Sequence, residues 1–219
     1  MALGDDAVFE ACRECRYRQD CSYVAGQFEA DAEILSVQGD LEANRVIVID
    51  HSTASILELL RNHEVEFGLA PAIPNMGEFQ FEPILDDPLY ACIPPTLDEG
   101  KEEIGLADLV GKPCILLSST TAVRGTIDAA LEALDIRLDA QFEVQQAMTA
   151  IALASAGLGI AILPRIALFH VSAPQFRAVP ITDSVVHRKV GLITARGYVQ
   201  NPTSEQLMNL IRASLRQTQ

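Results

Sequence analysis

Residues 46–70 read VIVIDHSTASILELLRNHEVEFGLA, and three local patterns follow one another within this stretch. VIVI at 46–49 is a continuous β-branched run typical of a buried strand, ILELLRN has helical spacing, and VEFGLA at 65–70 is a second strand. Strand, helix and strand in about 25 residues form a βαβ unit with parallel strands. Asn62 is placed to end the helix in the left-handed conformation that a C-cap favours. The stretch predicts an α/β fold.

The alternation of strand and helix continues outside this stretch. Residues 1–31 follow no clean period and suit at best an exposed edge strand, whereas residues 32–43 have helical spacing. Further strands are predicted at 81–85, 89–93, 113–117, 159–163 and 187–195, and helices at 123–134, at 145–156 and from Pro202 onward, with Ser204 as N-cap.

A break at residues 93–103 divides the chain. This segment, IPPTLDEGKEE, holds two prolines and a cluster of charge, so we interpret it as the point where the chain leaves a first lobe. A length of 219 residues suits two small lobes or one large α/β unit. We expect residues 1–94 and 198–219 in the first lobe and 95–197 in the second, with crossings near 93–96 and 196–199.

Composition excludes several classes of function. The formal charge of −14 and isoelectric point near 4.6 would repel a phosphate backbone, so this chain by itself is not expected to grip DNA or an anionic membrane. No apolar run approaches the roughly 20 residues of a spanning helix. The first residues lack a secretory-signal pattern, and the cysteines number five. Both observations fit a soluble protein of a reducing cytoplasm.

Gly157 and Gly159, in SAGLGIAILPR at 155–165, raise the question of a phosphate-binding loop. A dinucleotide fingerprint needs its glycines after a strand and before a helix. Here the helix comes first, and Ile162 stands where the third glycine is required. We therefore interpret Gly157 as a helix C-cap and Gly159 as a point of close packing, and we expect no cofactor.

Three partial motifs point to no chemistry. Cys12, Cys15 and Cys21 could supply thiolates to zinc or an iron–sulfur cluster, but no fourth ligand is evident nearby, and plain thiols are the simpler interpretation. His63-Glu64 begins HExxH without its second histidine, and LASAG lacks the first glycine of a nucleophile elbow. No catalytic residue and no metal site are expected, so the chain is not expected to be an enzyme.

Hydroxyl side chains gather where two predicted strands turn into helices: His51-Ser52-Thr53 follows VIVID, and Ser118-Ser119-Thr120-Thr121 follows CILL. The carboxyl ends of strands line the crevice of an open α/β sheet, and helix N-termini offer free N–H groups, so small anions are natural ligands. If each lobe contributes one junction, a carboxylate-bearing metabolite could bridge them across a cleft. Capping alone would also explain any one of these hydroxyls.

The ordered motifs resemble the regulatory, effector-binding domain of LysR-type transcriptional regulators. The stretch at 46–70 is similar to that family's strand, helix and v-D-f-G-i strand, with Glu66 where Asp is usual. FEPILDDPLYACIPP resembles its paired strands, IGLADLVGKPCILL its entry to the second lobe, AGLGIAILP its turn after an Ala-rich helix, and HRKVGLITARGYVQNPTSEQLMNLIR its closing strand and helix. The sequence departs from the family where Pro95-Thr96-Leu97 replaces His-Pro-Leu, and in residues 1–45, which do not show the apolar first strand.

The resemblance implies two Rossmann-like lobes of the type 2 periplasmic-binding-protein kind, with two crossover segments and a ligand cleft between them. It also implies a small-molecule effector, a homodimer or homotetramer whose regulatory domains pair side by side, and DNA binding only through an N-terminal winged helix-turn-helix domain that this sequence lacks. It places these residues near the effector: Ser22, Ser52, Thr53, Leu69, Ala70, Ser118, Ser119, Thr120 and Met148.

Two other functions share this architecture. An extracytoplasmic solute-binding protein has the same two-lobed logic but needs an export signal in its gene. A small-molecule enzyme needs an acid/base or nucleophile constellation, which the sequence does not show. We expect instead a cytoplasmic sensor in which effector binding shifts the population of lobe arrangements and, through it, the geometry of the oligomer.

Overall fold

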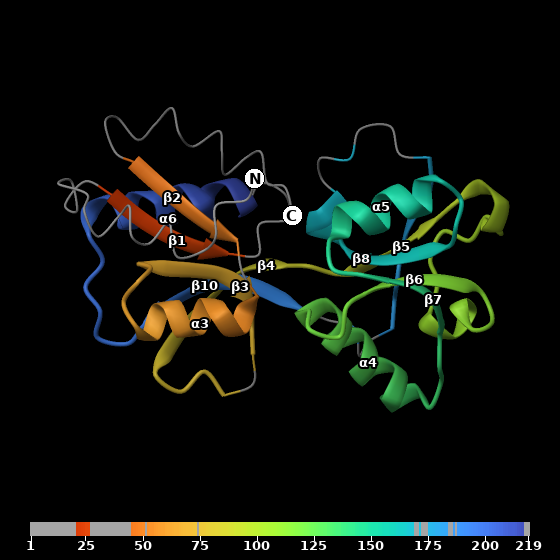
Figure 1. The fold of residues 1–219 in the computed structure, drawn as a ribbon, viewed down its shortest axis with the longest axis horizontal. Helices are drawn as coiled ribbons and strands as arrows, with labels where there is room; N and C mark the ends of the chain where they lie inside the picture. Colours follow the sequence, from red (N-terminus) through yellow and green to blue (C-terminus); the bar gives the residue numbers. More distant parts are fainter. Residues whose placement is uncertain are drawn as a thin grey trace, which may run out of the picture.

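A computed structural model of the chain describes residues 21–26, 45–50, 52–73, 75–168, 171, 175–183, 186 and 188–216. The described chain forms two α/β lobes, each built on a five-stranded sheet (Figure 1). The first sheet has the strand order β2-β1-β3-β10-β4, and the second has the order β7-β6-β8-β5-β9. The predicted two-lobed α/β architecture is confirmed.

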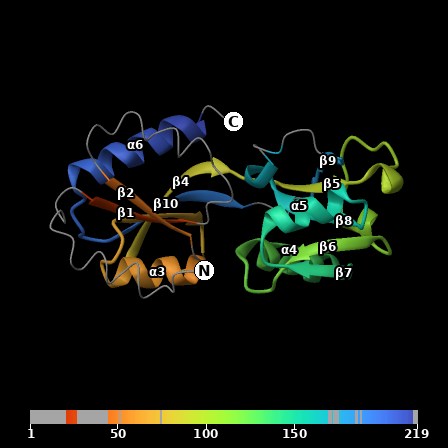
Figure 2. The same cartoon turned by 45° about the horizontal axis from the view of Figure 1, so that its top comes forward.

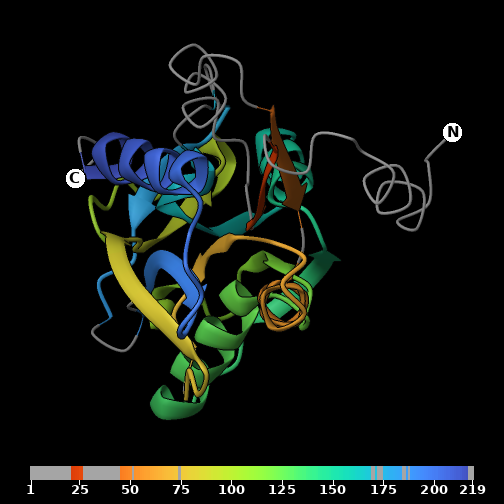
Figure 3. The same cartoon turned by 90° about the vertical axis from the view of Figure 1, so that its left-hand side faces the viewer.

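The first lobe is organised around β1 (Cys21–Gly26), which lies between β2 (Arg45–Asp50) and β3 (Phe67–Pro71) and is parallel to both. The helix α3 (Thr53–Arg61) connects β2 to β3, so the predicted βαβ unit is confirmed with β1 inserted between its strands. Figure 3 shows α3 and the last helix, α6, on opposite faces of this sheet. The lobe is completed by β4 (Phe79–Asp86), β10 (Lys189–Ala195) and α6 (Pro202–Arg216).

The second lobe repeats the theme around β6 (Pro113–Leu117). It is parallel to β7 (Asp139–Val144) and β8 (Ile160–Pro164), because the helices α4 (Ala122–Leu134) and α5 (Ala147–Ser155) return the chain each time. The core of this lobe is apolar, with Ile115, Ile127 and Ile162 fully buried. Two antiparallel strands complete its sheet: β5 (Leu89–Ile93) and β9 (Arg177–Pro180).

The predicted lobe boundaries are each displaced by one strand. The chain changes sheets between β4 and β5, at Asp87 and Pro88, and it returns between β9 and β10. Division at residues 94 and 197 therefore puts β5 and β10 with the wrong sheet. The physical reason is that Pro94 and Pro95 do not form a linker, because they lead into the short 3₁₀ turn η2 (Pro95–Leu97) inside the second lobe.

The amino-terminal expectation is also wrong in part. Cys21–Gly26 is an interior strand, not an exposed edge strand, and it supplies the first strand that the sequence did not reveal. Its segment CSYVAG is short and only partly apolar, and parallel pairing with strands on both sides is what secures it. The predicted helix at 32–43, like Cys12 and Cys15, lies outside the described residues.

Two predicted helix caps need correction. Asn62 does end α3, but with a right-handed φ of −82°, and the left-handed conformation falls on His63 at φ 56°. Ser204 does not cap α6, because it is buried in the first turn and its own N–H donates to Asn201 Oδ1 at 2.8 Å. The capping oxygen thus comes from the residue immediately before Pro202, the first residue of the helix.

The two glycines after α5 have the structural roles that the sequence predicts. Gly157 has φ +79° and donates its N–H to Ala154 O at 2.9 Å, which closes the helix. At Gly159, an added Cβ would lie 2.8 Å from Pro113 O and 3.3 Å from Ile115 Cγ1. The backbone at Gly159 is therefore packed directly against β6, where no side chain fits.

We expect Gly159→Ala to destabilise the protein by about 1 to 3 kcal/mol, because its methyl group would press on the β6 backbone. The matched control is Gly125→Ala within α4, where a Cβ meets nothing within 4 Å and alanine favours the helix by about 1 kcal/mol. Urea unfolding measures both. Equal effects of the two substitutions would contradict the packing role of Gly159.

Candidate functional site

Three parallel strands of each lobe end at the boundary between the lobes. These are β1, β2 and β3 in the first sheet and β6, β7 and β8 in the second. Figures 1 and 2 show the sheets side by side, with the beginnings of α3 and α4 turned toward the boundary. The region outside these strand ends is where open α/β sheets place their ligands.

The first-lobe junction consists of Ser52 and Thr53 at the start of α3. Ser52 is extended (φ −61°, ψ 153°), and its Oγ accepts a hydrogen bond from the Ser55 N–H at 3.3 Å, so the predicted hydroxyl does cap the helix. Thr53 is only 7% exposed, and its buried Oγ1 has no hydrogen-bond partner among the described residues. A buried hydroxyl without a partner costs stability, which makes Thr53 a candidate for a contact with a ligand.

The second-lobe junction is a turn that runs from the end of β6 into α4. Ser118 extends the strand ladder, since its N–H donates to Val144 O at 2.7 Å. Its Oγ lies 3.1 Å from Thr120 Oγ1 and accepts a longer hydrogen bond, 3.4 Å, from the Thr120 N–H. Ser119 and Thr120 are exposed at this end of the lobe. The three predicted residues therefore lie together in one turn.

Thr121, the next residue, is the N-cap of α4. Its Oγ1 accepts a hydrogen bond from the Arg124 N–H at 3.2 Å and donates to Ser118 O at 2.9 Å. Because Thr121 satisfies the capping requirement, the hydroxyls of Ser118, Ser119 and Thr120 are not needed for it. The alternative that these hydroxyls are simply N-caps thus applies to Ser52 and Thr121 and not to the other three.

The remaining predicted residues lie in three different settings. Leu69 and Ala70 are buried in β3, at 3% and 1% exposure, close to its carboxyl end. Met148 is 56% exposed in the first turn of α5, which follows β7. Ser22 pairs with Val46 at the amino end of β1, whereas Gly26 at the other end pairs with Leu69. Ser22 thus lies at the opposite end of β1 from Leu69, and because its side chain lies outside the described residues, its contact with an effector stays a prediction.

Arg124 holds the second junction in place, a role that the sequence analysis missed. Its Nη1 donates to Leu117 O at 3.2 Å and to Glu143 at 2.9 Å, and its Nε donates to Asp128 at 2.7 Å. Hydrogen bonding to Asp128 is the largest cause of a raised pKa for this guanidinium. One cation thus ties together β6, β7 and the start of α4. The available sequence signal was the Arg–Asp spacing of four residues on a helix.

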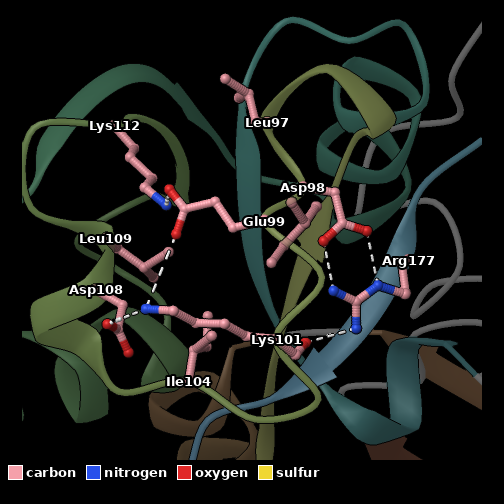
Figure 4. Close-up of a pocket in the computed structure, with 10 residues that line it drawn as sticks. Leu97, Asp98, Glu99, Lys101, Ile104, Asp108, Leu109, Lys112 and Arg177 are labelled. Atoms are coloured by element: carbon pink, nitrogen blue, oxygen red, sulfur yellow. Dashed lines mark hydrogen bonds and ion pairs between the residues drawn. The ribbon is translucent and has the colours of Figure 1, made fainter.

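A second charged cluster lies in the second lobe around η2 and β9 (Figure 4). It surrounds a cavity of about 10 Å³, which is room for about one water molecule. Its six charged side chains form ion pairs with one another: Asp98 with Arg177, Lys101 with Asp108 and Glu99, and Lys112 with Glu99. The cluster satisfies its own charges, and the cavity that it surrounds is too small for a metabolite, so it is not the candidate site.

The described cysteine side chains are buried thiols. Burial raises the pKa of Cys92 to about 12 and that of Cys114 to about 11, so neither is a thiolate at neutral pH. Of Cys21 only the backbone is described. In the described part of the chain, no group of three or more His, Cys, Asp or Glu is arranged to hold a metal ion.

Comparison with known proteins identifies the family of this chain. The family model described as the LysR substrate binding domain matches residues 43–216. An uncharacterised HTH-type transcriptional regulator of Escherichia coli K12, YbhD, is 26% identical over 168 residues, which are 76% of this chain and 53% of YbhD. The chain spans about half the length of the curated relatives it matches.

Solved structures share the fold. The effector-binding domain of QuiR in complex with shikimate superposes with a TM-score of 0.75 at 17% identity, over 90% of this chain and 97% of that one. The regulatory domain of Synechocystis PCC6803 CcmR in complex with 2-PG gives 0.78 at 15% identity, with the same coverage. This likeness shows the type 2 periplasmic-binding-protein-like arrangement of two lobes. Among the described helices, none combines the length and the apolar character needed to cross a membrane.

Arg177→Gln is expected to raise the pKa of Asp98 toward its ordinary value of 3.8. Hydrogen bonds from Arg177, with a further one from the Gly100 N–H, hold this pKa at about 2. Because the folded pKa is lowered, the pair stabilises the fold above about pH 4, and this contribution is lost as the pH falls toward 2. A carboxyl NMR titration measures the pKa, with Arg137→Gln as the control. An Asp98 pKa that stays near 2 in Arg177→Gln would contradict the assignment.

Proposed function

The chain belongs to the family of LysR substrate-binding domains, and from this premise we propose that it senses a small, carboxylate-bearing metabolite bound where the two lobes meet. The observation that carries the proposal is the pair of helix N-termini, capped by Ser52 and Thr121, that lie at the boundary, one from each lobe. A helix N-terminus presents free N–H groups and a partial positive charge, so two of them suit one anion between them.

The proposed contacts with the ligand are of two kinds, polar and apolar. The hydroxyls of Ser118, Ser119 and Thr120 are donors that capping does not use, and Thr53 Oγ1 is a buried group without a partner in the described chain. Ser52 contributes chiefly through the helix that it caps. Leu69, Ala70 and Met148 give the apolar lining, Met148 being the most exposed of the three. Arg124 positions the second-lobe turn without reaching the ligand.

Similarity to known proteins supports this class of ligand and this role. The shikimate held by the QuiR domain is a carboxylate, and the curated relatives are transcriptional regulators, which disfavours an extracytoplasmic solute-binding protein. In our proposal the chain binds its ligand without chemical conversion, in the cytoplasm. DNA is contacted by a winged helix-turn-helix domain N-terminal to residues 43–216, because this acidic chain is unsuited to a phosphate backbone.

Thr53→Val should separate binding from stability. Replacing an unpaired buried hydroxyl by a methyl group of similar shape is expected to leave the free protein equally stable or to stabilise it by about 1 kcal/mol. The same change should reduce the thermal stabilisation by carboxylates such as shikimate. Thr126→Val is the control, since Thr126 Oγ1 donates to Ala122 O within α4.

Thermal denaturation against small carboxylates and their neutral amides measures this effect. The expected result is stabilisation of the wild type and the control by at least one carboxylate and not by its amide, with a smaller shift for Thr53→Val. A wild type that responds to no carboxylate, or equally to acids and amides, would contradict the proposed function.

Helix α5 supports the second part of the proposal, a homodimer or homotetramer. Its inner side is buried through Ala147, Ala150, Ile151 and Ala154, and on its outer side Ala152 is exposed, with Leu158 45% exposed beyond its end. Exposed apolar side chains that gather on one side of a helix often mark a contact with another chain. We place a second copy of the chain on this outer side, so that a change of lobe arrangement alters the geometry of the oligomer.

Ala152→Arg is expected to convert the oligomer to monomers, because a guanidinium would be buried without a partner in the contact. Ala129→Arg on the exposed side of α4 is the control. Size-exclusion chromatography with light scattering gives the mass of each variant. A monomeric wild type, or an Ala152→Arg variant with the mass of the wild-type oligomer, would contradict the placement on α5.

A further inference from the structure

One buried ion pair joins the two crossings between the lobes. Asp87 lies on the first crossing, between β4 and β5, and Arg188 lies on the second, just before β10. Asp87 Oδ2 accepts hydrogen bonds from Arg188 Nε at 2.9 Å and Nη2 at 2.6 Å, and the two side chains are 0% and 7% exposed. The Asp87 N–H also donates to Arg188 O at 3.0 Å. The crossings are therefore bound side by side through both side chains and backbone.

A third segment is attached to the same carboxylate. The 3₁₀ turn η4 (Arg165–Leu168) follows β8 of the second lobe, and its Ile166 N–H donates to Asp87 Oδ1 at 3.0 Å. The Arg165 N–H donates to Pro88 O at 2.9 Å. The Ile166 side chain, in contrast, belongs to a core cluster of the first lobe. Both oxygens of Asp87 are thus occupied, each by a different segment, where the chain passes between the two sheets.

We infer that the Asp87–Arg188 pair is the latch of the interlobe hinge: it fixes one lobe arrangement, and a change of arrangement requires its contacts to be exchanged. A buried ion pair resists disruption strongly, because loss of one partner strands the other charge away from water. Arg188 also has a spare donor, since its Nη1 is buried without a partner in the described chain. A rotated arrangement that engages Nη1 offers the guanidinium a second set of contacts, which is what a two-state hinge needs.

The role is specific to the position of this pair. Asp98 and Arg177 form a comparable pair through two guanidinium nitrogens, but both belong to the second lobe and are partly exposed. If each ion pair contributed only to the stability of the fold, weakening either one would lower that stability and leave the lobe arrangement unchanged. The latch differs because weakening it changes the distribution of lobe arrangements. This inference does not depend on the identity, or the existence, of the proposed effector.

Double electron–electron resonance, which measures the distances between two spin labels, tests the latch when one label is placed on each lobe. Glu58 on α3 and Glu132 on α4 are exposed labelling positions, and a genetically encoded ketone amino acid at each leaves the five cysteines untouched. Asp87→Asn keeps the shape and an acceptor for the Ile166 N–H but removes the charge. Arg188→Lys keeps the charge but cannot make the two-nitrogen contact. Asp98→Asn is the matched control.

The wild type and Asp98→Asn are expected to give one narrow distance distribution. Asp87→Asn and Arg188→Lys should each raise the ratio of a second distance population to the main one by about tenfold, where minor states typically hold about 0.1 to 10% of the molecules. If Asp87→Asn does not fold, Arg188→Lys decides alone. Hinge variants that are folded, less heat-stable and unchanged in distance distribution would overturn the latch, as would a wild-type distribution as broad as theirs.

Discussion

The relative position of the two lobes depends on two crossings of the chain. On either side of them, antiparallel pairing continues: β4 with β10 in the first sheet and β5 with β9 in the second. Each crossing connects one of these ladders to the other. The sheets are therefore held in one orientation, with Asp87 and Arg188 buried between them. That orientation brings the carboxyl ends of the parallel strands together. Any site between the lobes is a consequence of this geometry and not of one residue.

The charge distribution explains how an acidic chain can suit an anion. Its acidic residues outnumber its basic ones by 30 to 16, and three of its described arginines are already engaged with acceptors of the chain itself. Arg124 serves three acceptors at the second junction, Arg212 pairs with Glu82, and Arg188 is committed to the hinge. An anion at the boundary would therefore meet backbone N–H groups and hydroxyls. Such donors are directional, so they select by shape as well as by charge.

Local patterns in the sequence were sufficient for the elements but not for their assembly. β-Branched runs and helical spacing placed β2, α3 and β6 within a few residues, since these signals reflect burial along one element. They could not assign β5 or β10 to a sheet, because an apolar strand has the same sequence pattern in either sheet. The predicted cap of the last helix was wrong because Asn201 takes the role that Ser204 was expected to have. The latch was missed because its partners are separated by 101 positions.

Buried polar atoms without a partner indicate where further contacts would be favourable. Among the described residues three buried polar side-chain atoms have no partner: Thr53 Oγ1, Arg188 Nη1 and Gln200 Oε1. Thr53 Oγ1 lies at the lobe boundary, where a hydrogen bond to a ligand would offset the cost of its burial. Arg188 Nη1 lies at the hinge, where a second lobe arrangement would do the same. Nothing in the structure explains Gln200 Oε1. The exposed apolar side chains on the outer side of α5 are a comparable feature, because covering them would also be favourable. A protein selected only for the stability of this one state would have filled such positions differently, since replacing an unpaired buried polar group with an apolar one is nearly neutral or stabilising.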